Sequence, residues 1–397
     1  MLRIRKVVVA DRAARELEGI AAFGEEAPEL LEKDQIIRDF TDPYLELIRL
    51  LREASEIEHA LLVQYLYAAF SVKPQYPLVM GFGFPNASDL LGVAVQEMQH
   101  LHQVNRLLVA LRAAPNLIRQ DFPYEPDIYP FELNLEPLGP SSIAKYVYTE
   151  ASMRALDRDD PANADQLAFL DRLFEILGEV RPNHLGSLYG TTIDVLHEVL
   201  ANPPSGLPDL TGWPAQLEQI KSEGEDAHFR FFRDLFMGTH RGFGGRPHIW
   251  ALPPSDPDYP AFPLPMNPSA FEGHPRQITD PAIREVGWLS NLHYWIVLAL
   301  LDLSYRYEAP VSMGLSKEHM TGPLLFLGKH LAALGVGISF DPLSMGYAMG
   351  TDRAFSVRLL SRLVSEADGL AQRIREHLPG DFPFAQTQQT LSALEQL

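Results

Sequence analysis

The stretch Glu97-Met98-Gln99-His100 decides how the rest of this sequence is interpreted. On an α-helix, residues three apart lie on one face, so this glutamate and this histidine project in the same direction. Apolar residues spaced by threes and fours surround them, and Glu97 itself occupies a position on that apolar stripe. A buried carboxylate and a buried imidazole are readily stabilised by a shared metal ion. We therefore expect a metal site inside a helical bundle.

The Glu-x-x-His pattern occurs three times, at Glu56-Ile57-Glu58-His59, at Glu97 to His100 and at Glu225-Asp226-Ala227-His228. Two such pairs, with one glutamate from each of two other helices, form the ligand set of carboxylate-bridged di-metal four-helix bundles. Carboxylate oxygens offset the repulsion between two neighbouring cations, and imidazole nitrogens complete the coordination. The repeated pattern therefore predicts a carboxylate-histidine metal centre.

On the first of these helices, Glu56 and Glu58 compete for the inward position. Two residues rotate an α-helix by roughly 200°, so both cannot face the core. The apolar stripe of this helix contains Glu58, which we therefore predict as the ligand. His59 then lies roughly 100° round the helix, either beside the ligands or at an interface.

Three further candidates each have a structural alternative. Glu150 follows a short apolar helix and could instead pair with Arg154. Glu225 stands in a charged run that is equally typical of a solvent-exposed surface, and His228 also fits a hydrogen-bonded core histidine. No catalytic residue is assigned. The predicted metal ligands are Glu58, Glu97, His100, Glu150, Glu225 and His228.

Composition limits the partners of this chain. The 397 residues carry a formal net charge of -19, which argues against nucleic acid and anionic membrane surfaces and favours small organic molecules or metal cations. The absence of cysteine excludes disulfides and thiolate ligands, so any metal must take nitrogen and oxygen ligands. The sequence has neither a signal-peptide core nor a run of ~18 apolar residues, so we predict a cytoplasmic protein.

The hydrophobic periodicity is helical throughout, and no segment alternates convincingly as a strand. We predict an all-α protein with a four-helix bundle, additional C-terminal helices and a long proline-rich connecting arm. Predicted helices cover about 42–71, 88–115, 141–150, 165–179, 184–201, 214–236, 280–307, 317–335 and 352–377. The predicted regions are an N-terminal extension (1–40), the bundle (41–237), the arm (238–278), a C-terminal helical region packed on the bundle (279–380) and a tail (381–397).

These residues together resemble the VioB-type ferritin-like domain, a family that includes iminophenyl-pyruvate dimer synthases. The resemblance runs from about residue 45 to 375 and rests on five short stretches. They are Glu58-His59-Ala60 with the run that follows it, Glu97 to Leu101 with Asn105, Tyr148-Thr149-Glu150, Gly224-Glu225, and His228-Phe229-Arg230-Phe231.

The resemblance implies a ferritin-like four-helix core that binds iron. It carries Glu58, Glu97, His100, Glu225 and His228 over as ligands. Related sequences have Gly-Glu in the third core helix, whereas here Gly186 is followed by Ser187. The third-helix carboxylate is therefore missing or supplied from elsewhere, with Glu150 as the candidate.

Two functions follow. The first is an oxygen- or peroxide-dependent oxidoreductase that acts on a small organic, amino-acid-derived substrate and holds one or two iron ions, with manganese or zinc as alternatives. The second is a non-catalytic helical scaffold or partner-binding protein with a degenerate metal site, which the loss of the third-helix glutamate favours. The sequence leaves open whether the chain is an enzyme and whether it forms a homo-oligomer.

Overall fold

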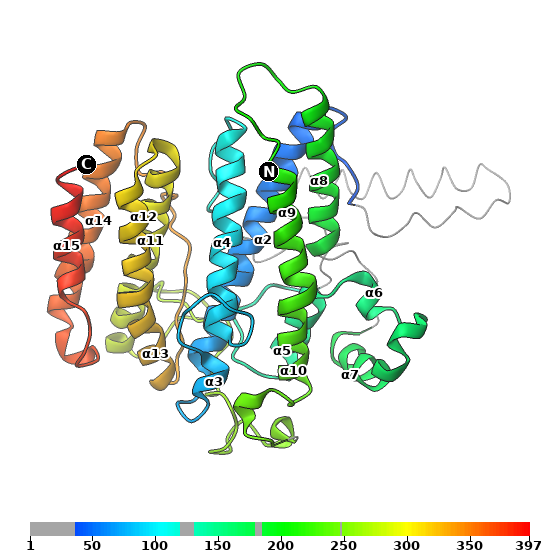
Figure 1. The fold of residues 1–397 in the computed structure, drawn as a ribbon. Helices are drawn as coiled ribbons and strands as arrows, with labels where there is room; N and C mark the ends of the chain where they lie inside the picture. Colours follow the sequence, from blue (N-terminus) through cyan, green and yellow to red (C-terminus); the bar gives the residue numbers. More distant parts are fainter. Residues whose placement is uncertain (1–35, 120–130, 179–184, 247) are drawn as a thin grey trace. The chain divides into compact units, whose positions relative to one another are not determined.

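Two long helices, α2 (Pro43–Ser71) and α4 (Leu90–Ala110), pack side by side in the computed structural model, which describes residues 36–119, 131–178, 185–246 and 248–397 (Figure 1). The side chain of Asp42 caps α2 by accepting a hydrogen bond from the backbone of Leu45, and Pro43 begins the helix. Asp89 caps α4 through the backbone of Gly92. The predicted limits of the first helix are confirmed.

The other half of the bundle contains a helix that changes its winding. Helix α9 (Trp213–Ser222) continues through a π-helical turn, η2 (Glu223–His228), into α10 (Phe229–Phe236). Helix α8 (Leu185–Ala201) packs against α2 and α9, whereas α5 (Pro140–Glu150) packs against α10. The continuous helix formed by α9, η2 and α10 therefore packs against two shorter helices, α8 and α5, which are separated in the sequence.

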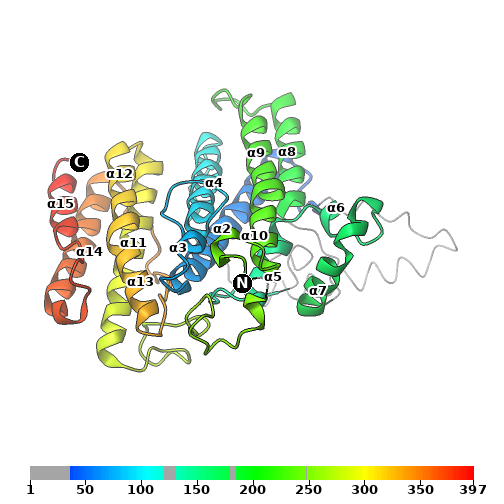
Figure 2. The same cartoon turned by 60° about the horizontal axis from the view of Figure 1, so that its bottom comes forward.

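The C-terminal helices form a second group on the α4 side of the bundle (Figures 1 and 2). Helix α11 (Pro281–Tyr307) contacts α4, and α13 (Leu325–Ala333) contacts α2. The helix predicted at 317–335 is in fact α12 (Pro310–His319) and α13, joined by the π turn η5 (Met320–Leu324). Pro323 lies inside that turn, where a residue without a backbone N–H interrupts regular α-helical hydrogen bonding.

The region predicted as a tail contains a helix, α15 (Ala385–Leu394), which packs against α14 (Arg353–Arg373). Residues 35–397 form one compact unit, and the part of the predicted extension that precedes residue 36 lies outside the described chain. The remaining short elements are α3 (Pro77–Met80), α6 (Met153–Leu156), α7 (Leu167–Leu177), η1 (Pro161–Gln166), η3 (Arg241–Phe243), η4 (Ile249–Ala251) and η6 (Arg375–His377).

The proline-rich arm packs against the end of α2. The backbone of Lys73 donates to the carbonyl of Pro260 at 2.8 Å, and that of Phe262 donates to the carbonyl of Ser71 at 2.7 Å. The described residues contain isolated β-bridges but no β-strand, so the predicted all-α class is confirmed. His59 lies at the interface of the two helix groups, where Tyr294 of α11 bonds its Nε2 at 2.7 Å.

Helix α11 is the one described helix long and apolar enough to cross a membrane by length and composition. Of its most apolar window, 94% is buried inside the fold, where it contacts α4, α12, α13 and α14. Burial of this kind is typical of the central helix of a protein core, which satisfies the same test.

Candidate metal centre

Five of the six predicted ligands converge inside the bundle. They come from four elements, and each of the five side chains is at most 3% exposed. Glu58 comes from α2, Glu97 and His100 from α4, Glu150 from the last residue of α5, and His228 from the end of η2. The first helix contributes Glu58 rather than Glu56, whose carboxylate instead accepts a hydrogen bond from Asn116.

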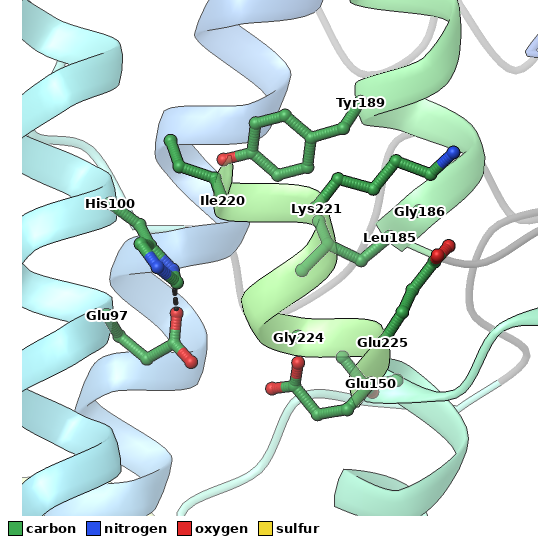
Figure 3. A pocket seen from close by; sticks show the side chains of 11 residues that line it. Glu97, His100, Glu150, Leu185, Gly186, Tyr189, Ile220, Lys221, Gly224 and Glu225 are labelled. Carbon is green, nitrogen blue, oxygen red and sulfur yellow. Dashed lines mark hydrogen bonds and ion pairs between the residues drawn. The ribbon is translucent and has the colours of Figure 1, made fainter. Parts of the chain in front are cut away.

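The five side chains form two overlapping groups that share Glu97. Ligand atoms of Glu58, Glu97 and His100 lie within 4.8 Å of one another, as do those of Glu97, Glu150 and His228. One oxygen of Glu97 lies 2.9 Å from His100 Nδ1, and the other lies 2.9 Å from His228 Nδ1. Figure 3 shows the contact between Glu97 and His100. Glu97 therefore stands where a carboxylate could bridge two cations.

The donor atoms of these groups fit a metal ion. Within the described chain, Glu58 Oε2, Glu97 Oε1 and His228 Nδ1 are buried without a hydrogen-bond partner. The last two atoms lie close together, yet their angles do not make a hydrogen bond. Leaving buried polar atoms unpaired costs about 1–3 kcal/mol each, and coordination to a shared cation would remove that cost. Carboxylate oxygen and imidazole nitrogen suit iron, manganese or zinc.

Comparison with known proteins identifies the domain that holds these side chains. Residues 51–237, which contain all the converging side chains, match the family described as ferritin-like. The chain carries a ferritin-like domain. The predicted resemblance to the VioB-type ferritin-like family is thereby confirmed.

The curated relatives include dichlorochromopyrrolate synthase from Lentzea aerocolonigenes, which is 25% identical over 391 residues. The match covers 79% of this chain and 38% of the relative, so the chain spans less than half of that protein's length. No solved structure matches this chain significantly.

Two buried tyrosines orient the outer carboxylates of the ferritin-like domain. Tyr189 of α8 donates its hydroxyl to Glu58 Oε1 at 2.5 Å, and Tyr65 of α2 donates to Glu150 Oε1. Each tyrosine thereby occupies one oxygen, and the remaining Oε2 atom of each glutamate lies 3.6 Å from a histidine Nδ1 of the cluster. The tyrosines therefore leave the other oxygen of each carboxylate facing the histidines of the cluster.

Each of the two histidines is oriented by a polar partner at its Nε2 atom. Nε2 of His100 lies 3.0 Å from Glu223 Oε2, and Nε2 of His228 lies 3.2 Å from Gln96 Oε1. A neutral imidazole that donates from Nε2 presents the lone pair of Nδ1. Once a cation displaces the extra proton of each ring, Glu223 and Gln96 would favour the tautomer in which both histidines direct an unprotonated Nδ1 at the cluster.

The structure does not bring Glu225 into either group, although this residue lines the pocket beside them. The prediction assumed α-helical spacing, in which Glu225 and His228 share a face. In the π turn, hydrogen bonds run from residue i to i+5, so residues five apart become neighbours. Glu223, which hydrophobic periodicity did not single out, therefore takes the position beside the cluster.

Gly224 leaves space for the carboxylate of Glu150 beside the cluster. A Cβ atom on Gly224 would lie 2.9 Å from Glu150 Oε2, closer than real Cβ contacts allow without a shift. Ser187 of α8, where the resemblance led us to expect a glutamate, is buried, and its Oγ has no hydrogen-bond partner in the described chain. Glu150 reaches the cluster because two separate helices, α5 and α8, together take the place of the third helix of the bundle.

The protonation of the cluster follows from its burial and its charges. Burial and the neighbouring Glu97 raise the pKa of Glu58 from 4.5 to about 8. Burial opposes ionisation of Glu97 as well, but the two imidazoles hold its pKa far below the usual range. Burial would lower the pKa of His228, yet Glu97 and Glu150 raise it to about 10. Without a metal, the cluster therefore binds protons that a cation would displace.

Substitution of Glu223 by glutamine distinguishes it from Glu225. We expect Glu223→Gln to weaken metal binding roughly 10- to 100-fold, because the bond that orients His100 loses its charge. Glu225→Gln, two residues away in the same turn, should leave the affinity within a few-fold of wild type. Competitive titration against a chromogenic zinc chelator measures both variants, and the opposite ranking would restore Glu225 as the ligand.

Proposed function

We propose that this protein is a metal-dependent oxidoreductase that uses dioxygen or peroxide on a small organic, amino-acid-derived substrate. The observation that carries the proposal is the pair of buried ligand groups joined by Glu97 inside a ferritin-like domain. The carboxylates and imidazoles of this cluster are almost fully buried. Bound protons or a bound cation must therefore offset the free-energy cost of burying their charges. We propose a cytoplasmic location on the sequence evidence alone.

Iron is the metal that we propose first, with manganese or zinc as alternatives. Glu58 and His100 would hold one ion and Glu150 and His228 the other, with Glu97 between them. A bound iron centre would supply one-electron redox chemistry and activate the oxidant. A single ion would use one of the two groups.

The protein's own residues would orient and protect that centre. Tyr65 and Tyr189 donate hydrogen bonds from their hydroxyl groups to the outer oxygens of Glu150 and Glu58, respectively. Burial raises the pKa of Tyr65 well above its usual value, so this proton stays in place near neutral pH. Ile220 and Leu185 line the pocket and limit the water that reaches the ligands. The carboxylates therefore keep one geometry while the oxidant and substrate approach.

The pocket above the cluster limits the size of the substrate. Its free volume is only about 10 Å³, close to the space that one water molecule needs. It is lined by Glu97, His100, Thr149, Glu150, Leu185, Gly186, Tyr189, Ile220, Lys221, Gly224 and Glu225 (Figure 3). Sites that enclose drug-sized ligands measure roughly 300–1,000 Å³, so this space is far smaller. The enclosed space therefore fits a small oxidant such as dioxygen or peroxide rather than a whole organic molecule.

The relative supports a small-molecule substrate. Its name describes a synthase whose product is dichlorochromopyrrolate, a small organic compound. Because this chain matches only 38% of that protein, the reaction itself is not carried over. What we carry over is only that the substrate is a small organic molecule.

The test begins with the metal. Purified protein reconstituted anaerobically with ferrous iron should retain one or two ions per chain, and an amino-acid-derived substrate should then accelerate dioxygen consumption. Elemental analysis and an oxygen electrode provide the two measurements. Protein that contains no iron, manganese or zinc as purified, and takes up none on reconstitution, would contradict the proposal.

The alternative, a non-catalytic helical scaffold, predicts a different result. Its support was the missing glutamate of the third helix, but Glu150 of α5 supplies a carboxylate to the group with Glu97 and His228. A protein that binds metal and gains stability from it, yet consumes no oxidant with any amino-acid-derived compound, would favour the scaffold.

A further inference from the structure

A pair of buried histidines connects three helices of the C-terminal group. His293 of α11 and His319, the last residue of α12, are both fully buried, and their Nδ1 atoms lie 3.0 Å apart. Nε2 of His319 lies 2.9 Å from the hydroxyl oxygen of Thr390, a buried residue of α15. The histidine pair, His293 and His319, therefore forms a buried polar link between α15 and the rest of the group.

The neighbouring hydrogen bonds determine where the protons of the neutral pair lie. Thr390 donates its one hydroxyl proton to the carbonyl of Gln386 at 2.9 Å, so His319 must donate from Nε2 to Thr390. A neutral His319 is then unprotonated at Nδ1 and accepts a hydrogen bond from Nδ1 of His293. The Nε2 atom of His293 therefore carries a free lone pair, and this buried atom has no hydrogen-bond partner in the described chain.

The surroundings of the pair contain no group that would balance a positive charge on it. The ring of Phe382 lies beside His293, with centroids 6.2 Å apart, and α15 contains no charged residue. Apart from exposed side chains, the titratable groups on the helices around the pair are Arg284, Tyr294, Asp302, Tyr305, Arg306 and Tyr307 of α11, His330 of α13 and Asp368 of α14. Each of these groups has a partner elsewhere.

Binding of a proton to the folded pair is therefore unfavourable. The lone pair of His293 Nε2 would accept the proton, but the resulting charge would be buried without an acceptor. Burial lowers the pKa of His319 from 6.5 to about 4, and burial together with the charge of His319 lowers the pKa of His293 well below 6.5. Movement of Phe382 and α15 away from the pair would expose the rings to water and restore their ordinary pKa.

We propose that the histidine pair is an acid-sensitive latch that releases α15 from the C-terminal helical group. Because the folded-state pKa of both histidines lies below 6.5, the latch stabilises the docked helix fully above pH 6.5. That contribution is lost as the pH falls from 6.5 toward 4. Helix α15 packs on α14 and α12 and lies at the outer edge of the group, away from the bundle (Figures 1 and 2). Its release therefore leaves the candidate metal centre in place.

Hydrogen exchange of the full, metal-free chain, followed by mass spectrometry, tests the latch. Relative to unprotected amides at the same pH, the amides of α15 should exchange roughly tenfold faster at pH 5 than at pH 7. The amides of α2 should keep their protection over this range, because the change is local to α15.

Replacement of both histidines by leucine, His293→Leu with His319→Leu, should remove the effect of pH. An apolar pair of similar size leaves no buried group unpaired, since Thr390 still donates to Gln386. Protection of α15 in this variant should differ by less than about threefold between pH 5 and pH 7. If α15 is not docked in this variant at pH 7, His293→Asn is the second variant. Its amide can donate in place of Nδ1–H, and the effect of pH should fall several-fold.

His330→Leu with His377→Leu provides the matched control, because it removes two histidines from the same helical group. The control should keep the wild-type dependence on pH. Equal protection of α15 at pH 5 and pH 7 in wild type would overturn the proposal, as would exchange of α15 in step with α2. An undiminished effect of pH after replacement of His293, or its loss in the control, would also overturn it.

Discussion

Replacement of Glu97 by alanine is expected to abolish the stabilisation that added metal gives the wild-type protein. Glu97 contributes an oxygen to both ligand groups, so its loss leaves neither group complete. At a free metal concentration one hundred times the dissociation constant, wild type should gain about 2.7 kcal/mol of unfolding free energy. The Glu97→Ala protein should gain close to none. Thermal or urea unfolding with and without ferrous iron or zinc measures the difference.

Two further variants make this experiment specific. Glu218→Ala removes an exposed carboxylate from α9 and should keep the full metal-dependent gain. Glu150→Ala removes a ligand from one group and leaves Glu58, Glu97 and His100 in place, so part of the gain should remain. If Glu97→Ala is stabilised by metal as strongly as wild type, the cation binds elsewhere and the cluster is not the metal centre.

The metal-free protein is expected to lose stability as the pH rises from about 6.5 to 10. The folded-state pKa of His228, about 10, lies above the ordinary value of 6.5, so its contribution is complete below pH 6.5 and is lost as the pH rises through 10. The pKa of Glu58 is raised from 4.5 to about 8, so folding favours its protonated form. Ionisation of Glu58 removes further stability as the pH rises from 4.5 to about 8. Each of the two groups should contribute on the order of 2 to 5 kcal/mol to this loss.

Metal should reverse this dependence, because the cation replaces the bound protons. Urea unfolding at several pH values between 6 and 9 should show a metal-dependent gain that grows as the pH rises. Glu58→Gln is the informative variant, since its neutral amide resembles the protonated glutamate and should flatten the Glu58 part of the metal-free profile. A metal-free stability that is constant or rises over this range would contradict the assigned protonation.

Much of the helical framework followed from hydrophobic periodicity and capping residues. The start of α2 was recognisable because an aspartate and a proline stand where the first unpaired N–H groups need a cap. Prediction failed where helices depart from α geometry. The π turn at Pro323 divides a helix that periodicity treated as continuous, and α15 carries too little apolar pattern to be recognised as a helix.

The candidate metal ligands were likewise predictable where α-helical spacing holds. The pair Glu97 and His100 was identifiable from sequence because α-helical spacing alone places both side chains on one buried face. Glu58 followed for the same reason, since its neighbours on the stripe are apolar. The lack of cysteine had already restricted any metal to oxygen and nitrogen ligands.

The sequence by itself thus determined the all-α class, the type of ligand and the helices that carry most of the site. Only the tertiary structure decided that Glu150 completes the second group and that Glu223, rather than Glu225, supports His100. The physical reason is that both depend on arrangements that local spacing does not encode. Glu150 reaches the cluster through the packing of α5 against α10, and Glu223 does so through the altered winding of a π turn.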